Sequence, residues 1–338
     1  MGADMESLAA SYERCRQLHR RHGRTYYLAT RLLPEWKRRH VHALYGFARY
    51  ADEIVDGTGA LPVTERARLL ADWSAAFLSG LAGQQRDTGL AGQQRDAGPA
   101  GQQRDGDPVL SAVLHTIRVF DLDLEDFRKF LASMAMDLTI SGYATYDDLL
   151  GYMEGSAAVI GTMMLPILEA SDPAAAREPA RQLGLAFQLT NFIRDVAVDL
   201  DLGRVYLPGA DLARFGVTPE DLRAARVAGG LRGMGAVGDA IRELIAFEVG
   251  RAREHYARAA PGVTLLAPGS QACVRAAYHL YGQILDEVER LDHDVFAGRA
   301  RVPRRRRLAV AVASVLTPAG VAVTGGPADG GRRRSLHA

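Results

Sequence analysis

The segment QLTNFIRDVAVDLDLGRVYLP, residues 188–208, carries four polar residues spaced three, four and four apart. If the segment is helical, they form one stripe: Gln188, Asn191, Asp195 and Asp199. At about 100° per residue the stripe spans an arc of roughly 80°. Two carboxylates four residues apart repel each other on a helix, so helix stability gives no reason for the pattern. Mg²⁺ prefers oxygen ligands such as carboxylates. The stripe therefore predicts a cation site, with a solvated charged face as the alternative.

A second stripe lies upstream in HALYGFARYADEIVDG, residues 42–57. It consists of Tyr45, Arg49, Asp52 and Asp56, within an arc of roughly 60°. The residues between the acids are apolar in both segments, which suits helices that line a buried cleft. We therefore expect the stripes to face each other across a cavity and to form one magnesium site able to hold a diphosphate. The expected metal ligands are Asp52, Asp56, Asn191, Asp195 and Asp199.

The other members of the stripes are expected on the substrate side. Arg49 is expected to pair with phosphate oxygens through its planar fork, and Gln188 to contact the substrate. The Tyr45 hydroxyl either touches phosphate or packs in the core. Glu53 lies about 100° off its stripe, which indicates an outer acid or a surface charge.

Both segments resemble signature motifs of the squalene and phytoene synthases, which couple two prenyl diphosphates head to head. The matching stretches are ALYGFARYADEIVD at 43–56, QLTNFIRDVAVD at 188–199 and GRVYLP at 203–208. Further family-like stretches are TYYLATRLLP at 25–34, AMDLTISGYATYDDLLGYMEGSAAVIGTMMLPIL at 135–168 and VFAGR at 295–299. The resemblance covers about residues 10 to 310, and GSAAVIGTMMLPIL is most similar to the bacterial phytoene synthases.

The resemblance implies roles for further residues. Arg24 and Thr25 would help to hold a diphosphate, with an N-cap by Thr25 as the alternative. Arg194 and Arg204 would be diphosphate contacts, although an arginine beside an acid is often only a salt bridge. The ring of Tyr152 would stabilise a carbocation, which places Tyr152 with the four aspartates in the expected catalytic set.

The implied activity is that of a prenyltransferase that joins two geranylgeranyl diphosphates into phytoene through prephytoene diphosphate. Mg²⁺ is the expected cofactor, with Mn²⁺ as a possible substitute, and phytoene formation needs no NADPH. The nearest alternative is the coupling of two farnesyl diphosphates to presqualene diphosphate, hydroxysqualene, dehydrosqualene or squalene. A non-catalytic scaffold protein on the same fold and a single-substrate terpene cyclase are more remote alternatives.

The composition is that of an ordinary globular protein, with 48% hydrophobic and 24% charged residues and a net charge of +1. This neutrality argues against a nucleic-acid partner. The two isolated cysteines, Cys15 and Cys273, show no metal or redox spacing and are expected to be buried in a reducing compartment. We expect a cytoplasmic protein, because the first residues do not resemble a signal peptide. Arg304–Arg307 either contact anionic lipid at the inner membrane surface or are solvated.

Strand signals are nearly absent, so the fold is predicted to be all-α, and the family implies one isoprenoid-synthase-type helical bundle around a deep apolar cavity. Residues 1–316 form this domain. Three nine-residue repeats, LAGQQRDTG, LAGQQRDAG and PAGQQRDGD at 81–107, contain few apolar residues and predict a disordered surface insertion. The arginine-rich segment from 304 is expected to be partly disordered, with 317–338 as a disordered basic tail.

Helices are expected at 7–22, 34–56, 63–78, 108–120, 124–136, 236–260 and 270–296. Thr145 and Asp148 have the spacing of a capping box, so Asp148 is expected to cap a helix rather than to act in catalysis. Asp137 matches a family position near the cavity, but an acid near a helix end can equally be structural.

Overall fold

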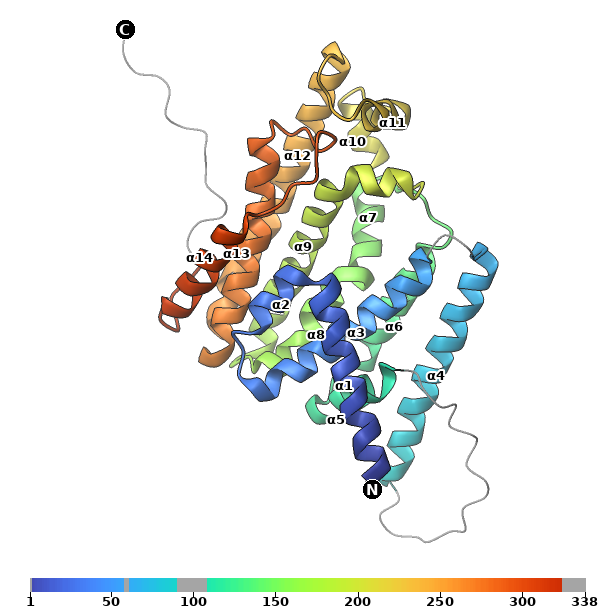
Figure 1. Cartoon of the computed structure of the whole chain (residues 1–338), viewed down its shortest axis with the longest axis vertical. Coiled ribbons are helices and arrows are strands. Elements are labelled where there is room, and N and C mark those ends of the chain that lie inside the picture. Colours follow the sequence, from blue (N-terminus) through green and yellow to red (C-terminus); the bar gives the residue numbers. More distant parts are fainter. Residues whose placement is uncertain (1, 58–60, 90–107, 324–338) are drawn as a thin grey trace.

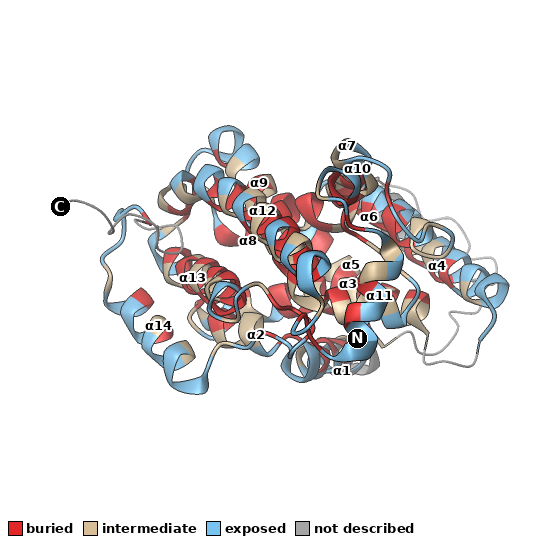
Figure 2. Ribbon diagram, turned by 90° about the horizontal axis from the view of Figure 1, so that it is seen from above, coloured by how far each residue is buried: buried red, intermediate tan, exposed pale blue. Residues whose placement is uncertain are grey.

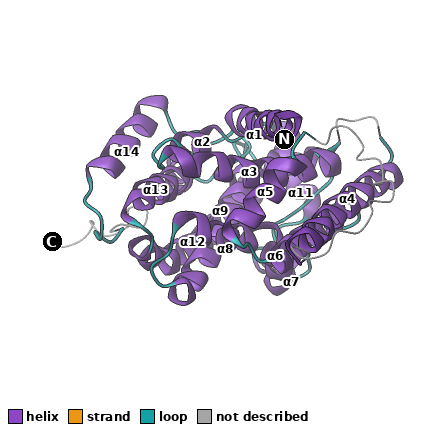
Figure 3. Ribbon diagram, turned by 90° about the horizontal axis from the view of Figure 1, so that it is seen from below, coloured by secondary structure: helices purple, strands orange, loops and turns teal. Residues whose placement is uncertain are grey.

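The computed structural model describes residues 2–57, 61–89 and 108–323, and every regular element in these ranges is a helix. Figure 1 shows their arrangement, and Figure 3 shows helices joined by loops. The helices are α1 (Gly2–His22), α2 (Arg24–Thr30), α3 (Glu35–Asp56), α4 (Val63–Gly89), α5 (Leu110–Phe120), α6 (Leu124–Met136), α7 (Tyr146–Met153), α8 (Val159–Leu168), α9 (Pro173–Asp201), α10 (Gly209–Arg214), α11 (Pro219–Ala228), α12 (Gly235–Ala259), α13 (Pro268–Arg290) and α14 (Arg304–Leu316). The predicted all-α class is confirmed.

Several helix ends follow from local sequence chemistry. Pro34 immediately precedes α3, where its fixed φ suits a helix start. The predicted capping box at the start of α7 is confirmed, because Thr145 and Asp148 exchange side-chain and backbone hydrogen bonds. Asp172 caps α9 in a similar way by accepting from the backbone N–H of Ala175. These residues determine where α3, α7 and α9 begin, and hence how far along α3 and α9 the polar stripes lie.

The interior consists of two apolar clusters that meet at the middle of the bundle. One gathers aromatic residues from α3, α4 and α6, including Phe47, Phe77 and Phe127. The other surrounds α9, which packs against α12 and α13, and includes Leu189 and Tyr256. Figure 2 shows the buried residues of α8, α9, α12 and α13 at the centre, with α4 and α14 at opposite edges.

Helices α7 and α8 form one continuous rod, joined by a π-helical turn at Glu154–Ala158. Its small residues allow very close packing against α9. A Cβ atom at Gly161 would lie 2.1 Å from the carbonyl oxygen of Ala180, and one at Gly184 would lie 2.3 Å from that of Ala157. A larger side chain at either position would therefore push the two backbones apart.

Two expectations about disorder are wrong in part. Residues 304–316 form α14, which packs against α13, and the following residues 317–321 are held by Arg275, whose guanidinium donates to four carbonyl oxygens between Ser314 and Val321. Helix α4 continues through 81–89, the first copy of the repeat, and Leu81 at the start of that copy is buried in the core. The remainder of the repeat, 90–107, and residues 324–338 lie outside the described residues.

Within the described residues, none of the helices has the length and apolarity needed to cross a lipid bilayer.

Candidate active site

The first acidic stripe occupies the last turns of α3. Arg49 donates to Asp52 over 2.5 Å and to Glu53 over 3.1 Å, so this arginine is held between two acids of its own helix. Glu53 also lies 3.6 Å from the imidazole of His22 on α1. The side chains of Asp52 and Asp56 are 43% and 38% exposed. This stripe is therefore at the rim of the site, where a solvated ligand can reach it.

The second stripe lies near the end of α9 and is more deeply placed. Asp195 accepts two hydrogen bonds from Arg194, at 2.9 and 2.5 Å, and two from Arg299, at 2.7 and 2.9 Å. Its side chain is only 15% exposed. Two bidentate arginines on one carboxylate are a strong, geometrically defined arrangement, and the second arginine comes from the loop after α13.

The loop after α9 joins the two stripes. Arg204 donates to Asp56 over 2.7 Å and to the backbone carbonyl of Asp137 over 3.2 Å. Asp56 at the end of α3 is therefore in contact with the loop that follows Asp199 on α9. The ends of α3 and α9, which carry the predicted aspartates, are thus linked through Arg204.

The charges of this cluster are unevenly compensated. Partial loss of hydration, and then the neighbouring charge of Asp56, raise the pKa of Asp52 to about 6, although 43% of its side chain remains exposed. Burial and the charge of Asp195 raise the pKa of Asp199 to about 7. Burial would also raise the pKa of Asp195, but hydrogen bonds from Arg194 and Arg299 outweigh it and lower this pKa. Two acids thus lack full charge compensation, and a divalent cation would supply it.

The residues fit a magnesium site completed by substrate. In the described ranges no three His, Cys, Asp or Glu side chains converge closely enough to enclose a metal. A Mg²⁺ ion bound here would therefore need water and substrate phosphates to complete its coordination. Asn191 could supply a further oxygen ligand, because its Oδ1 is buried and has no hydrogen-bond partner within the described structure. Such an unpartnered acceptor is costly unless a ligand satisfies it.

An apolar cavity of about 350 Å³ begins beside these groups. Gln188, Asn191 and Tyr45 lie at its polar end, and Leu168, Leu266 and Cys273 are among the apolar residues that line it. Along α9 its lining runs from Asn191 to Ala176, which at 1.5 Å per residue is a length of about 22 Å. The close backbone approaches at Gly161 and Gly184 form part of its wall. The space is long and apolar with a polar end, which suits a prenyl diphosphate.

Tyr45 lines this cavity with its ring stacked on that of His19, at a centroid distance of 4.0 Å. Gly23 makes room for the pair, because a Cβ there would lie 2.6 Å from Tyr45 and 2.8 Å from His19. The ring of Tyr45 is therefore packed, as the core alternative expected, while one side of it still belongs to the cavity wall.

Tyr152 is not among the residues that line the apolar cavity and instead packs in an aromatic cluster beside Asp137. Its hydroxyl donates to Asp137 over 2.7 Å, and Tyr206 donates to the other oxygen of the same carboxylate over 3.0 Å. The ring is 2% exposed and packs among Tyr143, Phe192 and Tyr206. Asp137 thus ties this aromatic cluster to the acidic site, and its role in holding both tyrosines is plain only from the structure.

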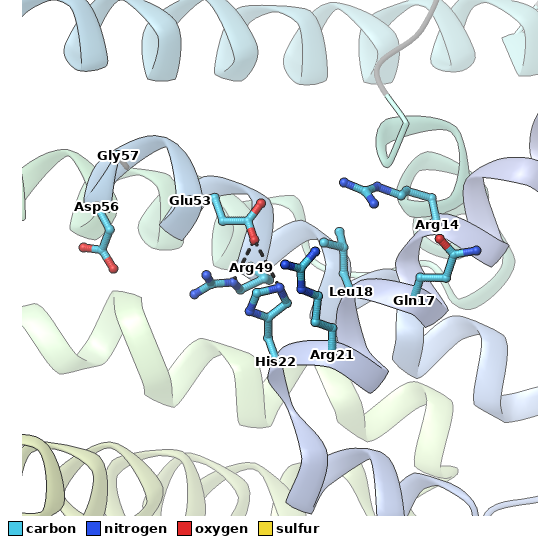
Figure 4. Close-up of a pocket in the computed structure, with 9 residues that line it drawn as sticks. All are labelled: Arg14, Gln17, Leu18, Arg21, His22, Arg49, Glu53, Asp56 and Gly57. Atoms are coloured by element: carbon cyan, nitrogen blue, oxygen red, sulfur yellow. Dashed lines mark hydrogen bonds and ion pairs between the residues drawn. The ribbon is translucent and has the colours of Figure 1, made fainter. Parts of the chain in front are cut away.

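A second hollow, of about 640 Å³, lies beside α1 and the end of α3. Figure 4 shows its lining, in which His22, Arg49 and Glu53 come together and Asp56 lies further along α3. Arg14 and Arg21 also line it, so the rim next to the acidic stripe is basic.

Arg24 is exposed at the start of α2, and Thr25 is half-buried. Gly23, rather than Thr25, is the N-cap residue of α2, so the capping alternative for Thr25 is wrong.

Arg299 is the site residue that sequence reasoning missed. It lies in the family-like stretch VFAGR at 295–299, which was noted without a role for its arginine. No periodicity links Arg299 to Asp195, because the two are 104 positions apart. The family-like character of the stretch was therefore the available signal.

Comparison with known proteins agrees with this geometry. The family model described as squalene/phytoene synthase matches residues 19–306. A phytoene synthase from Arthrospira platensis is 35% identical over 310 residues, which cover 88% of this chain and 90% of the relative. A 15-cis-phytoene synthase from Synechococcus elongatus is 33% identical over 315 residues, covering 90% of this chain and 92% of the relative.

Solved structures show the same fold. A dehydrosqualene synthase in complex with a ligand superposes with a TM-score of 0.70 at 24% identity, covering 92% of this chain and 98% of that one. A squalene synthase from Alicyclobacillus acidocaldarius gives a TM-score of 0.68 at 25% identity, covering 86% and 98%. The chain therefore belongs to the squalene/phytoene synthase family, whose members are prenyltransferases.

Proposed function

We propose that this prenyltransferase joins two molecules of geranylgeranyl diphosphate into phytoene through prephytoene diphosphate, as a step of carotenoid biosynthesis. The observation that carries the proposal is a long apolar cavity whose lining includes Tyr45, Gln188 and Asn191, which belong to the same two helical stripes as the four aspartates. Each substrate has a prenyl chain for the cavity and a diphosphate for the stripes.

The proposed metal ligands are Asp52, Asp56, Asn191, Asp195 and Asp199. Mg²⁺, or Mn²⁺ in its place, would neutralise the diphosphate charge as the carbon–oxygen bond breaks. Each side chain has a reason to take part. Asp52 and Asp199 are acids with raised pKa values that cation binding would favour in the charged form, and Asn191 has an unpartnered oxygen.

The arginines of the site would exchange partners when substrate binds. Arg49, Arg194 and Arg204 are now bonded to aspartates. Phosphate oxygens would take over these guanidinium groups, which match phosphate geometry, while the aspartates turn to cations. Gln188 and the Tyr45 hydroxyl are proposed substrate contacts at the polar end of the cavity, and Arg24 and Thr25 are proposed contacts at the start of α2.

The apolar cavity would protect the allylic cation that forms when diphosphate leaves. Water would quench such a cation, so its exclusion is necessary for coupling. The buried aromatic cluster that contains Tyr152 and Tyr206 would stabilise positive charge through the faces of its rings. Asp137 would hold both tyrosines in place through their hydroxyls.

The similarity to named relatives favours phytoene over a thirty-carbon product. The relatives named as phytoene synthases share about a third of their residues with this chain over nearly its whole length, as the 35% and 33% identities state. Thirty-carbon coupling of farnesyl diphosphate is the alternative, since the superposable structures are named as squalene and dehydrosqualene synthases.

We propose that no NADPH is needed, because phytoene formation involves no reduction. A scaffold role is disfavoured because all four aspartates are present.

The test is an incubation of the purified protein with Mg²⁺ and either geranylgeranyl or farnesyl diphosphate, without NADPH. Extracted hydrocarbons are then analysed by mass spectrometry. We expect a forty-carbon product from the first substrate alone. A thirty-carbon product from the second alone would keep the site and the mechanism but change the substrate, and no product from either would contradict the enzymatic proposal.

We further propose a cytoplasmic location with peripheral contact at the inner face of a membrane, since both the substrate chains and the product are hydrocarbons.

A further inference from the structure

Helix α14, RRRRLAVAVASVL at residues 304–316, is fixed to the bundle at both ends. Near its start Arg306 forms an ion pair with Glu287 of α13, at 2.8 Å. Near its end Arg275 of α13 donates to the carbonyl oxygens of Ser314 and Thr317, each at 3.1 Å. The face toward α13 carries the buried residues Ala311 and Ser314. The helix therefore has a defined orientation, with one face inward and one outward.

The outward face is an apolar stripe. Its members are strongly exposed: Leu308 62%, Val312 49%, Val315 57% and Leu316 75%. Their spacing of four, three and one places them within an arc of roughly 100°. Single exposed apolar residues are ordinary on a protein surface, but a contiguous stripe bordered by charge indicates an interaction site.

A basic cluster lies at one end of this stripe. Arg304, Arg305, Arg306 and Arg307 occupy the first turn of α14, which contains no acidic residue. Cations at a helix N-terminus oppose the helix dipole, so stability of the isolated helix does not account for them. Arg304 and Arg305 are exposed. Positive charge and an apolar stripe on one helix are complementary to an anionic lipid surface, which offers headgroup charge and acyl chains together.

We propose that α14 seats the protein on an anionic membrane surface, with Leu308, Val312, Val315 and Leu316 among the lipid chains and the arginines at the headgroups. The helix would lie in the plane of the interface, as amphipathic interfacial helices do. Figures 1 and 2 show α14 at one edge of the molecule, outside α13. A flat surface can therefore approach it.

This orientation would place the wall of the apolar cavity next to the membrane. Helix α14 packs against α13 and α2. Both helices line the cavity, α13 through residues such as Val274 and Ala277, and α2 through Tyr26 and Thr30. The consequence for catalysis, a short path between bilayer and cavity for greasy substrates and product, rests on the proposed function. The docking itself rests on α14 alone.

The first test is co-sedimentation of the full chain with vesicles of phosphatidylcholine, with and without phosphatidylglycerol. We expect binding to the anionic vesicles, and a marked loss of binding at high salt. Arg304→Gln with Arg305→Gln, and separately Leu308→Ser with Leu316→Ser, should each lower the partition coefficient about tenfold or more. The matched controls are Val227→Ser and Arg223→Gln on α11, where Val227 is 89% exposed and Arg223 is exposed. These should bind as the unaltered chain does.

A second test looks for a gained signal. Leu316→Trp would place an indole on the proposed contact face, and Val227→Trp would place one on α11. Brominated lipid in anionic vesicles should quench the first and leave the second unchanged. Quenching of neither, or equal binding by the variants and the unaltered chain, would overturn the proposal. Light scattering covers a further outcome. If the unaltered chain is a dimer that binds no vesicles, and the α14 variants are monomers, then a second copy of the chain covers the stripe and the membrane proposal is wrong.

The two proposals fail separately. In detergent, without vesicles, the α14 variants should keep the turnover of the unaltered chain, because none of the changed residues lines the cavity described above. An unaltered chain that binds vesicles but gives no hydrocarbon would contradict the proposed function and leave the membrane surface in place.

Discussion

Asp52 and Asp56 on α3 repeat the spacing of Asp195 and Asp199 on α9, but the two pairs lie in different electrostatic settings. On α3 each acid has one arginine partner, Arg49 or Arg204, and both side chains are more than a third exposed. On α9 Asp195 takes two bidentate arginines and is only 15% exposed. The equal spacing places the two aspartates of each helix on one face, whereas the arginines around each aspartate affect whether its carboxyl is charged.

The difference matters because a buried, paired acid and a rim acid serve a site in different ways. Removing the charge of Asp195 leaves Arg194 and Arg299 uncompensated, and unpaired buried charge is costly. Removing that of Asp52 relieves repulsion from Asp56. The α9 pair should therefore support both structure and chemistry, and the α3 pair mainly chemistry.

The largest expected effects come from Asp195→Asn and Asp52→Asn. Both should lower turnover at least about a hundredfold, because each removes a proposed cation ligand. They should differ in stability. Asp195→Asn should lower the free energy of unfolding by about 2 kcal/mol, and Asp52→Asn by less than about 0.5 kcal/mol. Steady-state assays and thermal unfolding of the same preparations would measure both effects.

Near-normal turnover in both variants would refute the assignment of these acids as metal ligands. Equal loss of stability would refute the contrast between the pairs while leaving that assignment in place. Asp201→Asn is the control, because Asp201 ends α9 as an exposed residue that is paired with Arg226, and it should change neither quantity.

A change of intermediate size is expected from Arg299→Gln. Asp195 would keep Arg194, so the fold should remain, but one of the two guanidinium groups available to phosphate would be lost. We expect KM for the prenyl diphosphate to rise about tenfold with a smaller fall in kcat. Arg226→Gln is the matched control, because it removes an arginine from an exposed ion pair with Asp201, and it should leave KM unchanged. An unchanged KM in Arg299→Gln would mean that Arg299 only stabilises Asp195.

The contrast between the pairs also shows what the sequence could and could not supply. Helical periodicity predicted the two stripes, and the all-α fold that carries them is confirmed. The arginines were harder to predict, because Arg299 and Arg204 reach acids 104 and 148 positions away and no local pattern encodes such contacts. Residues 304–316 were placed in the helical domain, but their arginine-rich start was expected to be partly disordered, because such a sequence resembles a solvated segment unless its packing on α13 is known.

A smaller effect is expected in the dependence of stability on pH. The pKa of Asp199 is raised from 3.8 to about 7 in the folded protein. The folded state therefore holds a proton that the unfolded state has lost, so the free energy of unfolding falls as pH rises through this range. Between pH 6 and 8 this group should contribute about 1.4 kcal/mol, or about 2 °C in Tm.

Thermal unfolding without metal would test this, with Asp199→Asn lacking that part of the slope. Mg²⁺ together with inorganic diphosphate should reduce the slope in the unaltered chain. The same slope in Asp199→Asn would assign it to other groups. Asp52 has a pKa of about 6 and should contribute in the same direction mainly at lower pH, which is why the comparison starts at pH 6.

The smallest effect is expected from Glu53→Gln, which asks whether α3 carries a third functional acid. Glu53 is 35% exposed and forms ion pairs with Arg49 and His22. When the charge of Glu53 is removed, Arg49 keeps its shorter hydrogen bond to Asp52. Surface ion pairs of this kind contribute little, so turnover should fall by less than about threefold. A loss as large as that in Asp52→Asn would mean that the position of Arg49 depends on both acids. The α3 site would then be a triad organised around one arginine, and its likeness to the α9 pair would be limited to spacing.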